Sequence, residues 1–182
     1  MNLIEKQLTA EYIYEGKIIK VRRDTAILPD GKNALREVIE HPGGVCVVPV
    51  TDDRKIMMVE QYRYPYSEII EEIPAGKRDS SDEEPLETGK RELKEEIGAT
   101  AENYIFLGKL YPTPGYCGEV IWMYAATGLS FGESRPDEDE FLNVKSYSLD
   151  EVVEKIMSGE ITDAKTQAAV LKVKLLADRE EI

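Results

Sequence analysis

The order of strand-like and helix-like segments is the feature that most limits how this chain can fold. Short stretches of β-branched and aromatic residues are separated by turn signals such as Pro29-Asp30-Gly31, a pattern typical of strands. We expect strands at residues 12–14, 17–28, 35–40, 45–50, 55–62, 67–73, 104–110, 120–126 and 141–147, with a loop at 128–138. Helical patterns are confined to residues 85–97, 149–157 and 163–176.

This order predicts an α+β fold, with a mixed β-sheet in an α/β/α sandwich and an extra antiparallel strand region at the N-terminus. A doubly wound parallel sheet would instead alternate strands and helices along the whole chain. At 182 residues, the chain suits one compact domain and is short for two. In the last helix, Ala164, Ala168, Leu171 and Leu175 recur at helical spacing, so we expect them to pack in the core or in a dimer.

The charge balance restricts the classes of partner. The chain carries 23 Lys and Arg residues against 36 Asp and Glu residues, a formal net charge of −13. Such a chain is not expected to bind nucleic acid or an anionic membrane by bulk electrostatics, and no apolar run approaches the ~18 residues that span a bilayer. A small phosphate-bearing substrate would need a bridging cation in this negative field.

The two cysteines and the N-terminus indicate the compartment. Cys46 and Cys117 lie among apolar residues and are too few for a disulfide framework. The first residues have charges within their apolar stretch and lack the apolar core of a signal peptide. We therefore expect a reducing, cytoplasmic location.

Three carboxylates share one face of the helix expected at residues 85–97. Glu92, Glu95 and Glu96 stand at i, i+3 and i+4, where like charges destabilise a helix by ~0.2–0.5 kcal/mol per pair. A divalent cation reverses this sign, because Mg²⁺ prefers carboxylate oxygens and takes water and phosphate oxygens as further ligands. Arg91 can orient Glu95 as an i, i+4 pair. The alternative interpretation is a solvated, glutamate-rich helix face.

The residues around this helix favour the metal site over the solvated face. An apolar strand runs into Pro74-Ala75-Gly76, an acidic loop and the helix follow, and Gly98 suits the position past the helix end. Glycine beside a metal site allows close approach of the backbone, and a backbone carbonyl such as that of Ala75 can be a ligand.

Together these residues resemble the sequence box of the Nudix hydrolases. The box is a glycine, five residues, a glutamate, seven residues and Arg-Glu-apolar-any-Glu-Glu-any-Gly-apolar. The chain supplies Gly76, Glu83, Arg91, Glu92, Leu93, Glu95, Glu96, Gly98 and Ala99. Six residues rather than five separate Gly76 from Glu83, and the extra residue falls in a loop, where an insertion costs little. This departure affects the role of Glu83 and not the helix ligands.

Further segments are similar to the ADP-ribose pyrophosphatase branch of that family, namely residues 36–45, 61–63 and 71–76, together with a marker proline at Pro114. The resemblance implies hydrolysis of ADP-ribose at its pyrophosphate to give AMP and ribose 5-phosphate. It implies Mg²⁺ as the cofactor, with Mn²⁺ as a substitute. Glu92 and Glu96 match the metal-binding positions, with Glu95 accessory to the metal and to catalysis and the Ala75 carbonyl as a further ligand.

The general base is implied to lie on a loop after the box. Glu138 and Glu140 are both candidates, and we favour Glu140 because it directly precedes an apolar strand. Arg63 could clamp a phosphate through its guanidinium. The remaining substrate-binding candidates are Arg36 and Glu37, which match a stretch near the nucleotide in related dimers, Tyr12, which offers an aromatic face for adenine, and Pro114.

Two alternatives remain open. The same chemistry could act on another nucleoside diphosphate sugar, such as ADP-glucose or GDP-mannose, because the box concerns only the shared pyrophosphate. A non-catalytic sensor of ADP-ribose would have a broken box, whereas here the metal glutamates are all present. The resemblance also implies a homodimer, in which residues 1–42 form exchanged N-terminal strands and residues 43–182 form the catalytic core of a single Nudix domain.

Overall fold

The strands at the N-terminus pair with one another in a three-stranded antiparallel sheet. In the computed structural model, which describes residues 2–138 and 140–182, this sheet belongs to the first of two units, which runs to Gly43 and includes Tyr111–Val120. Its strand order is β1 (Lys6–Glu15), β2 (Lys20–Ile27) and β3 (Asn33–Glu40). The predicted turn before β3 forms, with Gly31 at φ 85°. Every residue of β1 is exposed, so this sheet offers an uncovered face.

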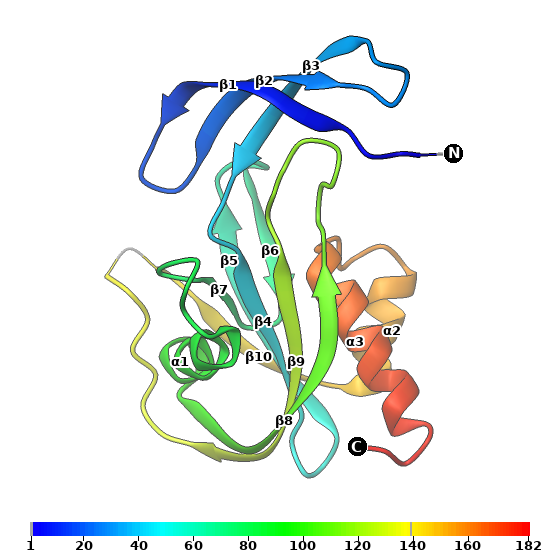
Figure 1. The fold of residues 1–182 in the computed structure, drawn as a ribbon. Coiled ribbons are helices and arrows are strands. Elements are labelled where there is room, and N and C mark those ends of the chain that lie inside the picture. The colour runs from blue at the N-terminus through cyan, green and yellow to red at the C-terminus, as the bar shows by residue number, and fades with distance from the viewer. Residues whose placement is uncertain (1, 139) are drawn as a thin grey trace. The chain divides into compact units, whose positions relative to one another are not determined.

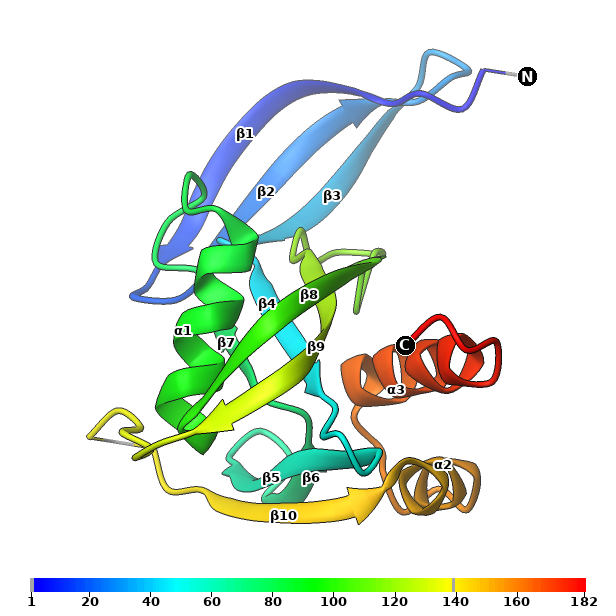
Figure 2. The same cartoon turned by 90° about the horizontal axis from the view of Figure 1, so that it is seen from below.

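The second unit, Gly44–Leu110 and Ile121–Ile182, is built on a mixed sheet with the order β7-β4-β9-β8. Strand β4 (Gly44–Pro49) runs parallel to β9 (Ile121–Phe131). The outer strands β7 (Ala75–Lys77) and β8 (Ala99–Leu110) are antiparallel to their neighbours. Helix α1 (Pro85–Ile97) covers one face and α3 (Ala164–Ala177) covers the other (Figures 1 and 2). The predicted α+β fold with a mixed sheet is thereby confirmed.

A smaller antiparallel sheet and one more helix complete the second unit. The sheet has the order β10-β5-β6, formed by Asn143–Ser148, Lys55–Arg63 and Glu68–Glu72. Helix α2 (Leu149–Met157) follows β10 directly, begins with a capping box between Ser148 and Glu151, and packs against α3. None of the helices described in the structure is long and apolar enough to span a membrane.

The core lies on both faces of β4, because side chains alternate along a strand. Cys46 and Val48 face the cluster that includes α3, whereas Val45 and Val47 face the cluster that includes α1. All six residues of β4 are buried. Cys46 is fully inaccessible, and burial raises the pKa of its thiol to about 12, whereas Cys117 is half-buried; both are free thiols.

Some expectations about the elements were wrong. Residues 128–131 continue β9 instead of beginning a loop, because they pair with the start of β8, from Ala99 opposite Phe131. The short strand β7 was not predicted. In α3 the buried residues are Thr166, Ala169, Val170 and Val173. The residues expected to face the core lie beside this buried face. Ala168 and Leu171 pack at the edge of the core, and Leu175 is exposed.

Candidate functional site

Strand β7, the loop after it and α1 place a glycine against a buried glutamate. A Cβ atom on Gly76 would lie 1.9 Å from the carboxylate carbon of Glu92, so a larger residue there would force the carboxylate to move. Pro85 occupies the first turn of α1, and Gly98 ends it in the left-handed conformation at φ 67°. The helix therefore has the predicted bounds, and its buried face carries Glu92 and Glu96 between the apolar residues that anchor it.

Glu92 and Glu96 are buried carboxylates, with exposed fractions of 7% and 2%. Desolvation raises the pKa of Glu92 from 4.5 to about 7, and the nearby Arg91 opposes part of that rise. Desolvation and then repulsion by Glu92 raise the pKa of Glu96 to about 8. The backbone N–H of Ala75 donates a hydrogen bond of 3.1 Å to Glu96 Oε2. The predicted residues Ala75, Glu92 and Glu96 thus lie together.

Arg91 gathers the remaining carboxylates of the box. Its Nη1 lies 2.8 Å from Glu92 Oε1 and 2.9 Å from Glu95 Oε2, and its Nε lies 3.9 Å from Glu83 Oε1. The predicted Arg91–Glu95 pair is therefore present. Glu83 also reaches this cluster despite the longer loop, and it accepts a 2.6 Å hydrogen bond from the backbone N–H of Asp79.

Arg78 organises the loop between β7 and α1, although no sequence pattern predicted it as a site residue. Its Nε donates to the carbonyl of Glu83 at 3.0 Å, and its Nη2 donates to the carbonyl of Ser81 at 2.5 Å. The guanidinium lies 4.7 Å from the ring centroid of Trp122. These contacts fix the insertion in one conformation, which explains how the extra residue is accommodated.

Arg63, at the end of β5, lies in the same region. Its Nε and Nη2 each donate a 2.6 Å hydrogen bond to Glu72, a buried residue at the end of β6. The hydrogen bonds to Glu72 are the largest cause of the raised pKa of Arg63, and the negative charge of Glu96 raises this pKa further. Neither Glu72 nor its second partner, Lys165, was singled out from the sequence, because Lys165 is 93 residues distant in the chain.

The two candidate bases differ in their surroundings. The negative charge of Glu140 raises the pKa of both Glu92 and Glu96, so the Glu140 carboxylate lies near enough to repel the buried pair. Glu138 is exposed in the turn before it. Asp139 lies outside the described residues.

The other substrate-binding candidates belong to the first unit. Tyr12 donates from its hydroxyl to Glu40 at 3.1 Å. Arg36 donates through Nε and Nη2 to Glu5 at 2.9 and 2.7 Å, while Glu37 and Pro114 are exposed. The two groups of predicted residues therefore fall in different units.

The donor groups of these residues can be compared with those that a divalent metal ion prefers. Among residues 2–138 and 140–182, no three His, Cys, Asp or Glu side chains form a ready-made metal cage. The site does contain two buried carboxylates, Glu92 and Glu96, next to Gly76, whose lack of a side chain leaves the backbone accessible. Such a set suits Mg²⁺, which is commonly bound by one or two carboxylates and completes its shell with water and substrate phosphates. The residues therefore fit a divalent ion.

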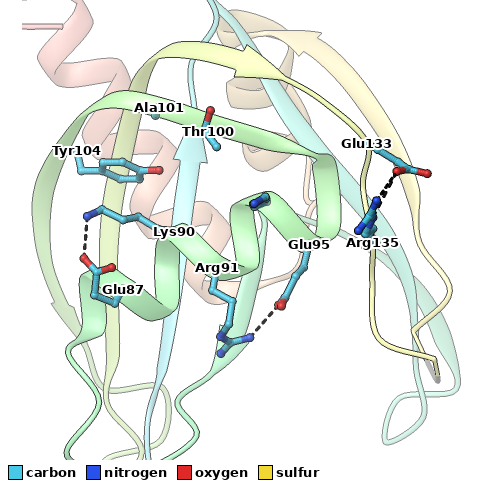
Figure 3. Close-up of a pocket in the computed structure, with 10 residues that line it drawn as sticks. Glu87, Lys90, Arg91, Glu95, Thr100, Ala101, Tyr104, Glu133 and Arg135 are labelled. Carbon is cyan, nitrogen blue, oxygen red and sulfur yellow. Dashed lines mark hydrogen bonds and ion pairs between the residues drawn. The ribbon is translucent and has the colours of Figure 1, made fainter.

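A cavity of about 850 Å³ flanks α1 on the side of β8 (Figure 3). Its lining is Glu87, Lys90, Arg91, Lys94, Glu95, Thr100, Ala101, Tyr104, Glu133 and Arg135. Three of its cations are paired with carboxylates: Lys90 with Glu87, Arg91 with Glu95, and Arg135 with Glu133. Because Glu92 and Glu96 do not line it, we do not place the metal-dependent chemistry in this cavity.

Comparison with known families identifies the class of protein. A family model described as the NUDIX domain matches residues 40–169, and one described as the nucleoside diphosphate sugar hydrolase N-terminal domain matches residues 5–39. The chain belongs to the Nudix family.

Individual relatives match almost the whole chain. A protein named methanol dehydrogenase activator from Bacillus methanolicus is 41% identical, over 94% of this chain and 93% of its own length. A protein named ADP-ribose pyrophosphatase from Bacillus subtilis (strain 168) is 40% identical, over 96% and 95%. A solved structure described as an ADP compounds hydrolase superimposes with a TM-score of 0.85 over the whole of both chains, at 22% identity, which shows the shared fold.

Proposed function

We propose that this chain hydrolyses the pyrophosphate of ADP-ribose, giving AMP and ribose 5-phosphate. The observation that carries the proposal is the buried pair Glu92 and Glu96, with Glu92 against Gly76, within a Nudix box that keeps all its glutamates. Two relatives that are 40% and 36% identical to this chain are named ADP-ribose pyrophosphatase, which supports this substrate.

Nudix hydrolases of this kind generally need a divalent metal. We propose Mg²⁺, with Mn²⁺ as a substitute, held by Glu92, Glu96 and the carbonyl of Ala75, with Glu95 accessory. When bound, the ion supplies positive charge that offsets the anionic diphosphate in a chain of net charge −13.

The protein's own residues would orient the substrate and move the proton. Arg63 would hold a diphosphate oxygen through the N–H groups that are not used by Glu72. Glu140 would accept the proton from the attacking water, because its carboxylate acts on the buried pair and its loop reaches the site. Arg91 would fix the orientation of Glu92 and Glu95.

The first unit would bind the adenosine half of the substrate in a homodimer. Its support is the uncovered sheet, where Leu8, Tyr12, Ile13, Tyr14 and Leu35 are large exposed hydrophobic residues. Tyr12, Arg36, Glu37 and Pro114 would then contribute to the nucleotide site. A monomeric mass in light scattering at micromolar concentration would remove this part of the proposal. The cytoplasmic location and the absence of nucleic-acid or membrane partners stay predictions from the sequence.

The substrate assignment is tested with purified protein, Mg²⁺ and a panel of ADP-ribose, ADP-glucose and GDP-mannose. We expect ADP-ribose to have the highest kcat/KM, with AMP and ribose 5-phosphate as products. A higher value for another sugar would assign the chain to that substrate. Glu96→Gln should lower kcat by orders of magnitude, whereas Glu154→Gln, at an exposed position of α2, should not. A wild-type protein that binds ADP-ribose without turnover would be the sensor.

A second candidate follows from the relative named methanol dehydrogenase activator, which is 41% identical to this chain, against 40% for the ADP-ribose pyrophosphatase from Bacillus subtilis. The chain would then act on a methanol dehydrogenase as its partner. Adding the chain to a methanol dehydrogenase and measuring the turnover of that enzyme distinguishes the two candidates. Activation abolished by Glu96→Gln would support this role, and an unchanged rate would exclude it for the enzyme tested.

A further inference from the structure

A buried cluster of charges at the end of β6 connects Arg63 to two residues, Glu72 and Lys165, that have no role in the chemistry described so far. Glu72 is 2% exposed, yet its carboxylate is paired with two cations, Arg63 and Lys165. Arg63 lies side-on to the carboxylate, with Nε 2.6 Å from one oxygen and Nη2 2.6 Å from the other. This bidentate arrangement fixes the plane of the guanidinium as well as its position.

Lys165 connects this pair to the start of α3. Its ammonium group binds Glu72 and lies 3.0 Å from Asp163 Oδ1, with only 11% of the side chain exposed. Asp163 is the N-cap of α3: it accepts hydrogen bonds from the backbone N–H of Thr166 at 2.9 Å and from its hydroxyl at 2.6 Å. The position of Lys165 is therefore set by the first turn of the helix.

The same turn of α3 also holds the backbone that follows Glu72. The N–H of Ile73 donates to Thr166 Oγ1 at 3.0 Å, and Thr166 is fully buried. The strand end that presents Glu72 to Arg63 is thus fixed twice, through the side chain of Glu72 and through the backbone of Ile73. Two residues further on stands Ala75, which donates to Glu96.

A buried ion cluster of this kind is weak evidence for stability. Desolvation of charged groups offsets much of their attraction, and apolar residues of similar volume would serve a purely structural purpose as well or better. The N–H groups of Arg63 that Glu72 does not occupy suggest a purpose other than stability. A guanidinium has five N–H groups, and the pair with Glu72 occupies Nε–H and one of the N–H groups on Nη2. The other N–H groups point away from Glu72, and 37% of the Arg63 side chain is exposed.

We propose that Glu72 and Lys165 are positioning residues, which hold Arg63 with its outer edge directed at the diphosphate of the substrate. The inference rests on the proposed function, because it assigns these residues a role in that same site. Glu72 fixes the plane of the guanidinium, and Lys165 fixes Glu72 relative to α3. The C-terminal helix thereby sets the geometry of an arginine about a hundred positions earlier in the chain.

The test is a double-mutant comparison of hydrolysis. Glu72→Gln and Lys165→Met should each lower kcat/KM for ADP-ribose about tenfold to a hundredfold, because a misplaced orienting group loses its effect. In an Arg63→Gln background, either change should lower kcat/KM by less than about twofold, since its target is gone. Lys165→Arg, which keeps the charge, should recover most of the activity.

Lys174→Met is the matched control on the same helix. Lys174 pairs with two exposed carboxylates, Asp150 and Asp178, so its loss should leave kcat/KM within about twofold. Urea unfolding identifies any variant that is not folded under assay conditions. If Glu72→Gln does not fold, the comparison of Lys165→Met with Lys165→Arg, with and without Arg63→Gln, decides the question.

A readout independent of activity is the side-chain Nε–H signal of Arg63 in NMR spectra. It should exchange with solvent at least about tenfold faster in Glu72→Gln than in the wild type. Losses that add fully to that of Arg63→Gln, or an unchanged exchange rate, would overturn the inference while leaving the hydrolase assignment intact. A wild type that cleaves a different nucleotide sugar would change the substrate only, and the variants would be compared on that sugar. A wild type that cleaves no diphosphate would overturn both.

Discussion

Replacement of Glu96 by glutamine should stabilise the metal-free protein, and the gain should grow with pH. The pKa of Glu96 is 4.5 in the unfolded chain and about 8 in the folded protein, because the carboxylate is desolvated and faces Glu92. The protonated form is thus favoured by folding. The stability that it confers is fully present below pH 4.5 and is lost as the pH rises through 8.

The two pKa values of Glu96 give the size of this change in unfolding free energy. The ionisation of Glu96 lowers the unfolding free energy, relative to a permanently protonated residue, by about 1 kcal/mol at pH 5 and by about 5 kcal/mol at pH 8.5. Glutamine removes this loss and keeps an oxygen that can accept from the N–H of Ala75. We therefore expect Glu96→Gln to gain about 4 kcal/mol in unfolding free energy, relative to the wild type, between these two pH values.

Urea unfolding with EDTA present measures this difference, with the fluorescence of the one tryptophan, Trp122, as the signal. Glu95→Gln is the control: its side chain is 33% exposed and pairs with Arg91, so its effect should stay within about 1 kcal/mol at both pH values. Saturating Mg²⁺ should raise the stability of the wild type and not that of Glu96→Gln. An advantage of Glu96→Gln that is equal at pH 5 and pH 8.5 would refute the assignment of Glu96 as a desolvated carboxylate.

Three further predictions concern the site. Gly76→Ala should lower kcat/KM at least ~100-fold by displacing the Glu92 carboxylate, whereas Gly118→Ala, whose nearest neighbour would be 3.4 Å away, should not. Gly98→Ala should lower the unfolding free energy by about 3 kcal/mol, because a left-handed residue gains a Cβ only 2.4 Å from the carbonyl of Gly132. Gly159→Ala, at φ +82° in open space, should cost only about 1 kcal/mol in the same urea titration. Glu140→Gln should lower kcat by ~10²-fold or more and Glu138→Gln by less than about tenfold; the reverse order in steady-state kinetics would make Glu138 the base.

Local signals explain which parts of the fold could be predicted. Helices α1 and α2 have the expected bounds, because Pro85 and Gly98 delimit one and the Ser148 cap begins the other. Strand β7 has three residues and owes its existence to pairing with β4, so nothing in its own sequence distinguishes it from a loop. The ends of β8 and β9 support each other across the hairpin, which overrides the turn tendency of Gly128.

The residues of the site also divide into those that sequence patterns predict and those that they do not. Glu92, Glu95 and Glu96 follow from helical spacing, and Ala75 and Gly76 follow from the strand that leads into the helix. Arg78 was missed because its hydrogen bonds are to backbone carbonyls of its own loop, which no residue pattern announces. Glu72 and Lys165 were missed because their contact joins distant elements. Sequence spacing therefore predicts what one helix arranges, and packing decides the rest.

The contrast between the two cysteines has a practical consequence for spectroscopy. Cys46 is sealed inside the sheet with its thiol protonated at any working pH, so alkylating reagents should leave it untouched in the folded protein. Cys117, half-buried and in the other unit, then becomes a single attachment point for a spin label or fluorophore without any mutagenesis.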